Sequence, residues 1–182
     1  MNQELHYSNK VILVLDTSAF LAKYPLQVYG SHIILYTTPS VLDEARDKET
    51  RESVELAMIL NRIIVKKPSD RYIRYVQEVA TKIGEHHSLS STDIDVIALA
   101  YELLTNNNRV IVITDDYSIQ NTLLHMGIPF KPLRTRGIHA LRKYIVFCPA
   151  CYYTSSNLKE DKCPICGSPL KKKSVKKSSE KP

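Results

Sequence analysis

The chain has 182 residues, of which 43% are hydrophobic and 24% charged, a composition typical of globular proteins. No apolar run approaches the roughly 20 residues that a membrane helix needs, so we expect no membrane span. The first residues, MNQELHYSNK, lack a basic start followed by an apolar stretch. We therefore expect no signal peptide and a cytoplasmic protein.

The net charge of +6 is unevenly spread along the chain. Residues 1–130 hold 12 Lys and Arg against 16 Asp and Glu, whereas residues 131–182 hold 13 against 3. A lysine-rich segment suits a polyanion such as nucleic acid, and an acidic segment suits bound cations. The alternative is that the basic segment only keeps the protein soluble.

The elements expected in the first half of the chain alternate between strand and helix. The apolar run VILVLD ends on Asp16 and predicts a buried strand, after which Thr17 and Ser18 favour an immediate helix. HIILYTT (32–38) predicts a second strand, and Pro39 occupies a favourable first position of the next helix. Residues 51–63 have helical periodicity, while RIIVKKP fits either the end of that helix or a short strand.

The same alternation continues to residue 133. Residues 69–83 predict a helix that ends at Gly84, and residues 90–104 predict another that starts near Ser90. RVIVIT (109–114) predicts a strand, and residues 117–126 predict a helix stopped by Gly127. IPFKPL (128–133) predicts a last strand, placed at an edge by its prolines. The expected fold is α/β, with a parallel sheet between two layers of helices and its functional residues at the carboxyl ends of the strands.

Acidic residues follow the predicted strands, begin a predicted helix or, for Glu44, lie within the helix after the second strand. We expect five of them at one rim of the sheet: Asp16, Glu44, Asp93, Asp115 and Asp116. Clustered carboxylates repel one another, and a divalent cation can relieve that repulsion. Mg²⁺ or Mn²⁺ prefers oxygen ligands, binds phosphates and can activate water for phosphodiester hydrolysis. Each residue alone also has a simpler explanation, because it could be a helix cap or lie on a solvated surface.

These motifs resemble those of a known family. VLDTSAF, PSVLDEARD, LSSTDIDVIALA and VITDDYSIQN are similar to the ordered acidic motifs of PIN-domain nucleases, over roughly residues 10–132. LSSTDIDVIALAYEL with TDDYSIQN resembles the Nob endonucleases, which free the 3′ end of small-subunit rRNA from its precursor. The resemblance implies a catalytic set that binds one or two Mg²⁺ or Mn²⁺ ions, formed by Asp16, Glu44, Asp93 and the pair Asp115 and Asp116, with Asp116 favoured over Asp115. It also implies that Thr17 or Ser18, and Thr114, orient carboxylates or water.

Four cysteines form two CxxC pairs separated by eleven residues: Cys148, Cys151, Cys163 and Cys166. Two thiolate pairs of this kind close a tetrahedral site, so we expect one structural Zn²⁺ in a zinc ribbon. A rubredoxin-type iron site and redox thiols are the alternatives. A module of this size buries little apolar surface, so its stability should come from the metal.

Basic residues surround this module and precede it. We expect RNA contacts from arginines and lysines between the two modules and within the ribbon: Arg134, Arg136, Arg142, Lys143, Lys159, Lys162, Lys171 and Lys172. Tyr152 and Tyr153 could stack on bases, or could pack within the ribbon itself. The expected organisation is a PIN-like nuclease domain (1–132), a hinge (133–142), a zinc ribbon (143–171) and a disordered basic tail (172–182).

The resemblance implies a metal-dependent endoribonuclease acting on precursor small-subunit rRNA in a pre-ribosomal particle, with no small-molecule cofactor and no membrane partner. Two alternatives remain at this level. One is a toxin-like PIN ribonuclease that cuts tRNA or mRNA. The other is a non-catalytic RNA-binding adaptor of ribosome assembly.

Overall fold

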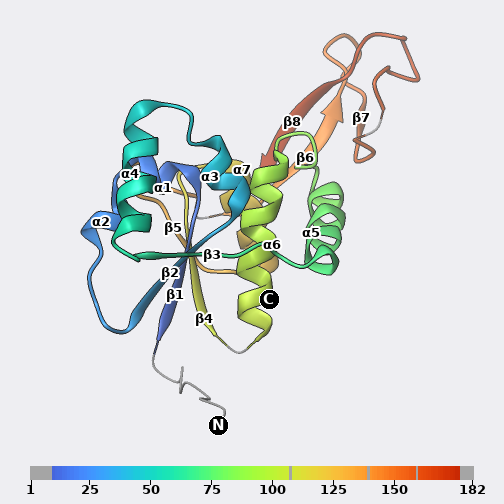
Figure 1. The fold of residues 1–182 in the computed structure, drawn as a ribbon. Coiled ribbons are helices and arrows are strands. Elements are labelled where there is room, and N and C mark those ends of the chain that lie inside the picture. Colours follow the sequence, from blue (N-terminus) through green and yellow to red (C-terminus); the bar gives the residue numbers. More distant parts are fainter. Residues whose placement is uncertain (1–9, 107, 139, 159, 177–182) are drawn as a thin grey trace.

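The computed structural model describes residues 10–106, 108–138, 140–158 and 160–176. These residues form a body of one sheet and its helices, from which a small second sheet projects (Figure 1). Among the helices in these ranges, none has the length and apolar character that a membrane crossing requires.

The body is built on a five-stranded parallel sheet in the order β3-β2-β1-β4-β5. Its strands are β1 (Val11–Leu15), β2 (Ile33–Thr37), β3 (Ile63–Val65), β4 (Arg109–Ile113) and β5 (Phe130–Lys131). The central strand β1 is almost completely buried, which explains its uninterrupted apolar sequence. The parallel sheet and the edge position of residues 130–131 confirm the sequence prediction, and residues 63–65 prove to be a strand.

Seven helices flank this sheet in the described part of the chain: α1 (Thr17–Leu21), α2 (Tyr24–Gln27), α3 (Pro39–Glu44), α4 (Lys48–Ile59), α5 (Asp70–Ile83), α6 (Ser91–Thr105) and α7 (Tyr117–Met126) (Figure 1). Two of these helices end at the glycines predicted from the sequence. Gly84 and Gly127 end α5 and α7 with φ of 81° and 70°, a backbone conformation that suits glycine. Helix α4 lies earlier than the predicted 51–63, because Asp47 caps it by accepting the Thr50 N–H at 2.9 Å.

Helix α6 is the most deeply buried helix of the body. Its residues 96–100 are fully buried, and it packs against β1, β4 and α5. Because α6 lies against the central strands, the residue at its first turn is held close to the carboxyl end of β1. The position of Asp93 in space is therefore fixed by apolar packing further along the same helix.

The projecting sheet is antiparallel, in the order β7-β6-β8, and comprises β6 (Arg142–Phe147), β7 (Thr154–Ser155) and β8 (Lys171–Lys176). Strand β8 corrects one expectation. The lysine-rich composition predicts a disordered tail from residue 172, but residues 172–176 continue a strand that begins at Lys171 and pairs with β6, from Lys176 opposite Arg142 to Lys171 opposite Phe147. The local lysine-rich composition suggested disorder, and the pairing with an apolar strand overrides it. Residues 177–182 lie outside the described residues.

A buried carboxylate ties the far end of α6 to the loop before α5. Glu102 is 7% exposed and accepts hydrogen bonds from the Ser69 N–H at 2.8 Å and the Ser69 hydroxyl at 3.1 Å. It also forms an ion pair with Lys66 at 3.0 Å. Burial alone would raise the pKa of Glu102, but the hydrogen bonds from Ser69 and the contact with Lys66 outweigh it, and the pKa lies below its usual value.

We therefore expect Glu102→Ala to lower the free energy of unfolding by roughly 2–4 kcal/mol, because the partly exposed Lys66 and two hydrogen bonds from Ser69 lose their buried acceptor. Urea denaturation at neutral pH measures this value. The matched control is Glu55→Ala, which removes an exposed pair with Arg51 and should cost about 0.5 kcal/mol or less. Equal effects of the two substitutions would contradict the assigned role of Glu102.

Candidate active site and metal centre

Asp16 lies directly after the central strand β1 and is 5% exposed. Three neutral groups donate to its carboxylate: the Thr17 N–H at 2.6 Å, the Ser18 hydroxyl at 3.1 Å and the Thr114 hydroxyl at 2.9 Å. Burial raises the pKa of Asp16, these hydrogen bonds oppose the rise, and the negative charge of Asp116 adds to it. The side chain is therefore rigidly oriented but electrostatically uncompensated.

Asp93 lies in the first turn of α6 and faces the same acidic region. It forms a capping box with Ser90: the Ser90 N–H donates to Asp93 Oδ2 at 2.7 Å, and the Asp93 N–H donates to the Ser90 hydroxyl at 3.1 Å. Burial raises the pKa of Asp93 to about 6, and the negative charges of Asp16 and Asp116 contribute to this rise. The hydrogen bonds with Ser90 lower the pKa but do not outweigh these effects. The three carboxylates thus interact although they are distant in sequence.

The adjacent residues Asp115 and Asp116 have different environments. Asp116 caps α7, its Oδ1 accepting the Ser118 and Ile119 N–H groups at 2.6 and 3.0 Å. Asp115 points the other way and accepts the N–H groups of the segment 133–135 at 2.8 to 3.1 Å. Burial acts to raise the pKa of Asp115, but these hydrogen bonds outweigh it and lower the pKa. Of these two residues, Asp116 is the one whose negative charge raises the pKa of Asp16 and of Asp93.

Glu44, the last residue of α3, is exposed at the rim of this region. Its Oε2 accepts a hydrogen bond from the Thr17 hydroxyl at 3.0 Å, so one residue of α1 connects it to Asp16. The structure therefore brings Asp16, Asp93 and Asp116 together, and Thr17 connects Glu44 to this group. Asp115 instead binds the backbone of residues 133–135.

The acidic cluster, by which we mean Asp16, Asp93 and Asp116 with Glu44 at its rim, forms no ion pair with a lysine or arginine among the described residues. The ion pairs among the described residues involve Glu52, Glu55 and Glu102, and none involves the cluster. Its carboxylates do not form a group close enough to hold one ion through three direct ligands, at least within the described ranges. Mg²⁺ usually keeps several waters and takes only one or two carboxylates along with phosphate oxygens, so this spacing fits such an ion.

The four cysteines form the second site. Their sulfur atoms lie within 4.8 Å of one another, with Cys148 and Cys166 at 3.4 Å and Cys151 and Cys163 also at 3.4 Å. Cys148 and Cys163 are buried. Ser168 lowers the pKa of the Cys166 thiol to about 6, which favours the thiolate. Four converging sulfurs leave no open coordination position, so the group suits a structural ion.

The basic residues expected to contact RNA differ in their exposure and in their contacts. Arg134, Arg136, Lys162 and Lys171 are exposed, and the Arg134 N–H donates to Asp115. Lys172 is exposed but donates to the Gly84 carbonyl of the body. The backbones of Arg142 and Lys143 belong to β6, their side chains are not described, and Lys159 lies outside the described residues.

The two neighbouring tyrosines of the ribbon differ as well. Tyr152 is 81% exposed, whereas the Tyr153 hydroxyl donates to Glu160 Oε2 at 3.3 Å within the module. The Tyr152 ring is thus accessible for stacking on a base, whereas Tyr153 forms a hydrogen bond within the ribbon. Sequence reasoning missed a hydrogen bond from the Ser40 hydroxyl to Asp95 at 2.8 Å, which links α3 to α6 beside the cluster.

The chain is similar to known proteins over most of its length. Residues 13–103 match the family described as the PIN domain of ribonuclease. The chain is 37% identical to Endoribonuclease Nob1 of Pyrococcus abyssi over 89% of this chain and 93% of that protein. It is 39% identical to Endoribonuclease Nob1 of Methanocaldococcus jannaschii over 91% of this chain and 79% of that protein.

A third relative, Ribonuclease VapC3 of Aeropyrum pernix, is 38% identical over 69% of this chain and 88% of that protein. The PIN-type sheet, the acidic cluster at its rim and the four-cysteine module are thus found in a chain that aligns with the archaeal Nob1 proteins over most of its length. On this evidence the chain belongs to the PIN-domain ribonucleases and, among them, to the Nob1 endoribonuclease family.

Proposed function

We propose that this protein is a divalent-metal-dependent endoribonuclease that cleaves precursor small-subunit rRNA to form its 3′ end. The observation that supports the proposal most is the acidic cluster, because Asp16 and Asp93 are held near Asp116 without an ion pair to any lysine or arginine in the described part of the chain. Such a group suits Mg²⁺ or Mn²⁺ together with a phosphate. The similarity to proteins named Endoribonuclease Nob1 supports the reaction type.

In this proposal Asp16, Asp93 and Asp116 hold the metal, and Glu44 completes the set at the rim. A bound Mg²⁺ or Mn²⁺ would activate water for attack on the scissile phosphate and stabilise the leaving oxygen. The chain's own groups fix the geometry: Thr114 and Ser18 donate to Asp16 Oδ2, and Thr17 connects Asp16 to Glu44. Ser90 and the first turn of α7 orient the other two carboxylates.

In the same proposal the four-cysteine site holds one Zn²⁺, and the ribbon binds RNA. Tyr152 and the exposed Lys162 and Lys171 lie on this module, where a ring can stack on a base and lysines can follow the phosphates. Arg134 and Arg136 lie on the segment that leads from the body to the ribbon. The proposed partner is precursor small-subunit rRNA within a pre-ribosomal particle.

The second candidate function is that of a ribonuclease acting on free tRNA or mRNA. The similarity to Ribonuclease VapC3 over 69% of the chain favours it. Offering the purified protein tRNA and a fragment of precursor rRNA in the same reaction separates the two candidates. Preferential cleavage of tRNA would favour the second.

Asp16→Asn is expected to reduce cleavage of a precursor rRNA fragment in Mn²⁺ by roughly 100-fold or more, since losing several kcal/mol of metal-based stabilisation costs at least two orders of magnitude in rate. Gel analysis of a 3′-labelled fragment measures it. The matched control is Asp70→Asn, beside Ser69 and the opposite end of α6, which should cut like wild type. The proposal fails if Asp16→Asn and wild type cut equally.

Asp115→Asn and Asp116→Asn separate the two adjacent acids. We expect Asp116→Asn to abolish most cleavage at nearly unchanged stability, because Asn can still accept the α7 N–H groups. Asp115→Asn should instead lower the free energy of unfolding by about 1–2 kcal/mol, because several N–H groups of residues 133–135 lose a charged acceptor. The cleavage rates and the urea unfolding midpoints of both variants measure these two effects. The reverse pattern would make Asp115 the metal ligand.

Asp93→Asn tests the electrostatic argument by pH. A carboxyl whose folded pKa is about 6, above its value in an unfolded chain, contributes stability at low pH that is lost as the pH rises through 6. Metal-free Asp93→Asn should therefore be more stable than wild type at pH 7, by about 1–3 kcal/mol, and nearly equal at pH 4. Thermal unfolding at both values measures this. Mn²⁺ should stabilise wild type more than the variant, and no difference would contradict the assignment.

The cysteine site makes its own prediction. Purified wild type should contain one zinc per chain by elemental analysis, and Cys151→Ser with Cys163→Ser should contain almost none. Without the metal the ribbon should lose its dispersed amide resonances, while the body keeps its own cooperative unfolding, because its core does not depend on the cysteines. Iron in place of zinc, or a ribbon that stays folded without metal, would refute this assignment.

A further inference from the structure

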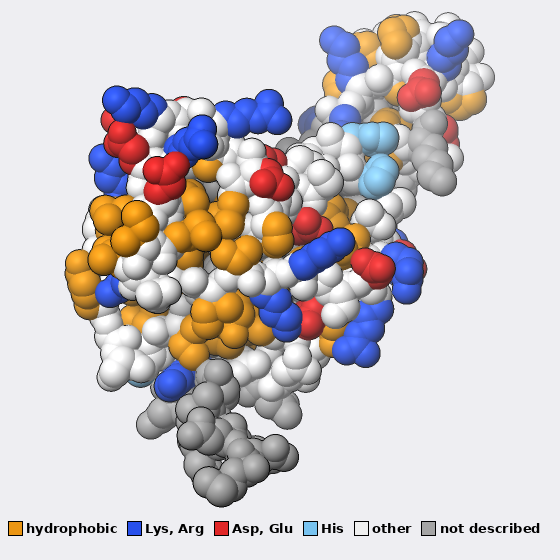
Figure 2. All heavy atoms as spheres, viewed as in Figure 1, with side chains coloured by type: hydrophobic (Ala, Val, Ile, Leu, Met, Phe, Trp, Pro, Cys, Tyr) orange, Lys and Arg blue, Asp and Glu red, His pale blue; other side chains and the backbone are white. Residues whose placement is uncertain are grey.

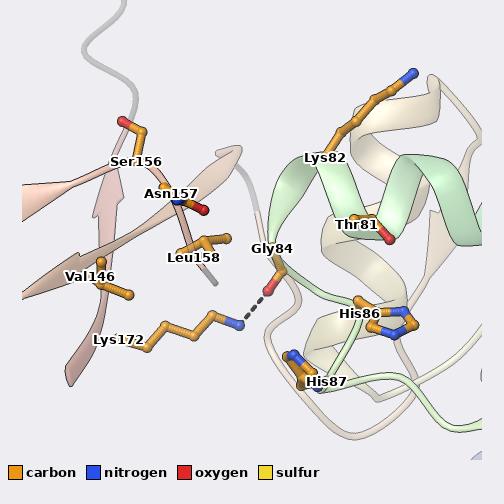
Figure 3. Close-up of a pocket in the computed structure, with 10 residues that line it drawn as sticks. All are labelled: Thr81, Lys82, Gly84, His86, His87, Val146, Ser156, Asn157, Leu158 and Lys172. Atoms are coloured by element: carbon orange, nitrogen blue, oxygen red, sulfur yellow. Dashed lines mark hydrogen bonds between the residues drawn. The ribbon is translucent and has the colours of Figure 1, made fainter. Parts of the chain in front are cut away.

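A cavity of about 260 Å³ lies where the body meets the ribbon (Figure 3). The body contributes the end of α5 and the loop that follows it, and the ribbon contributes β6, β8 and residues 156–158. Figure 2 shows histidine side chains gathered at this neck. No part of the acidic cluster lines the cavity, so it is a separate feature of the molecule.

The two modules meet at Gly84. A Cβ at this position would overlap Leu158 Cδ1, so a larger residue would force the Leu158 side chain to move, and the φ of 81° also favours glycine here. The Lys172 ammonium donates to the Gly84 carbonyl and lies 4.1 Å from the centroid of the Tyr144 ring. These contacts hold the two walls of the cavity together.

The lining combines an apolar wall with imidazoles and cations. Val146 is buried, and Figure 3 shows the Leu158 side chain directed at Gly84 from the ribbon. His86 and His87 are exposed, with ring centroids 5.2 Å apart. Lys82 extends outward from the end of α5. Among the described residues, no aspartate or glutamate lines the cavity, so its chemistry suits a planar ring attached to a negatively charged group.

We propose that this cavity binds one unpaired nucleotide of single-stranded RNA. The base would lie against the imidazole rings and the apolar wall, and the adjacent phosphates would lie near Lys82 and Lys172. Proteins recognise unpaired bases by stacking them on aromatic side chains, histidine included, while cations follow the backbone. The cavity, at about 260 Å³, is slightly smaller than the usual range for ligand pockets, roughly 300–1,000 Å³, so it suits no more than a single nucleotide and excludes a duplex.

The inference deepens the proposed function and rests on it for the identity of the polymer. His87 precedes Asp93 by six residues, so their Cα atoms lie at most roughly 20 Å apart along even a fully extended chain. A short single-stranded segment can therefore occupy the cavity and reach the acidic cluster at the same time. The cavity would then set which phosphate of the strand meets the carboxylates.

Fluorescence anisotropy of the full chain with a short labelled single-stranded oligoribonucleotide, without added divalent ions, tests the inference. His86→Ala with His87→Ala should weaken binding about tenfold, from the loss of base stacking. Lys82→Glu should weaken binding similarly and lower the salt dependence by about one phosphate contact. The controls His32→Ala and Arg109→Glu change exposed residues at the amino ends of β2 and β4 and should bind as wild type.

The inference is overturned if both cavity variants bind like wild type, or if a duplex or the matching oligodeoxyribonucleotide binds as tightly as the RNA. Cross-linking of 4-thiouridine RNA should place adducts on peptides containing residues 84–87 or 156–158, and adducts confined to other peptides would also overturn it. Asp16→Asn should bind RNA normally and fail to cut it. If wild type binds through the cavity yet cuts no RNA, the proposed function fails while the binding site stands.

Discussion

The electrostatic position of Asp16 is the constraint on which the acidic cluster depends. Its carboxylate lies at the end of the central strand, buried, with only neutral donors around it. The protein thus stabilises the orientation of the charge without neutralising it, and the negative charge of Asp116 raises the pKa of Asp16 further, while Asp16 and Asp116 together raise the pKa of Asp93. Such an arrangement lowers the stability of the metal-free fold. In the proposed function, a bound divalent ion would relieve this repulsion.

The residues of this cluster are at the same time helix caps. Asp93 with Ser90 begins α6, and Asp116 begins α7. The capping explanation and the catalytic explanation, which compete when the sequence is read alone, are therefore compatible. A cap uses some of the lone pairs of a carboxylate and fixes its rotamer, and the remaining ones stay available to a metal. Capping thus supplies the preorganisation that a metal site needs.

The sequence predicted features with local causes, and it missed those with distant ones. The strands, the glycine helix ends and the cysteine spacing are local patterns, and the structure follows them. The adjacent residues Asp115 and Asp116 could not be separated in this way, because Asp115 is turned away by the backbone of residues 133–135, some twenty positions later. Likewise, the lysines of residues 172–176 favour solvent and predict a disordered tail, while the pairing of these residues with β6 is a long-range contact that the local sequence does not reveal.

Strand β8 also places several lysines of the basic C-terminal segment at defined positions in the structure. Side chains alternate between the two faces of a strand, and residues directly opposite in an antiparallel pair share a face. Lys172 is opposite Val146, and both line the junction cavity. Lys171 and Lys173 must then project from the other face, where Lys173 approaches the Phe147 ring at 5.9 Å. One strand therefore divides its lysines between an anchor to the body and an outer basic surface. A basic segment that served only solubility would not need to be paired in register with an apolar strand.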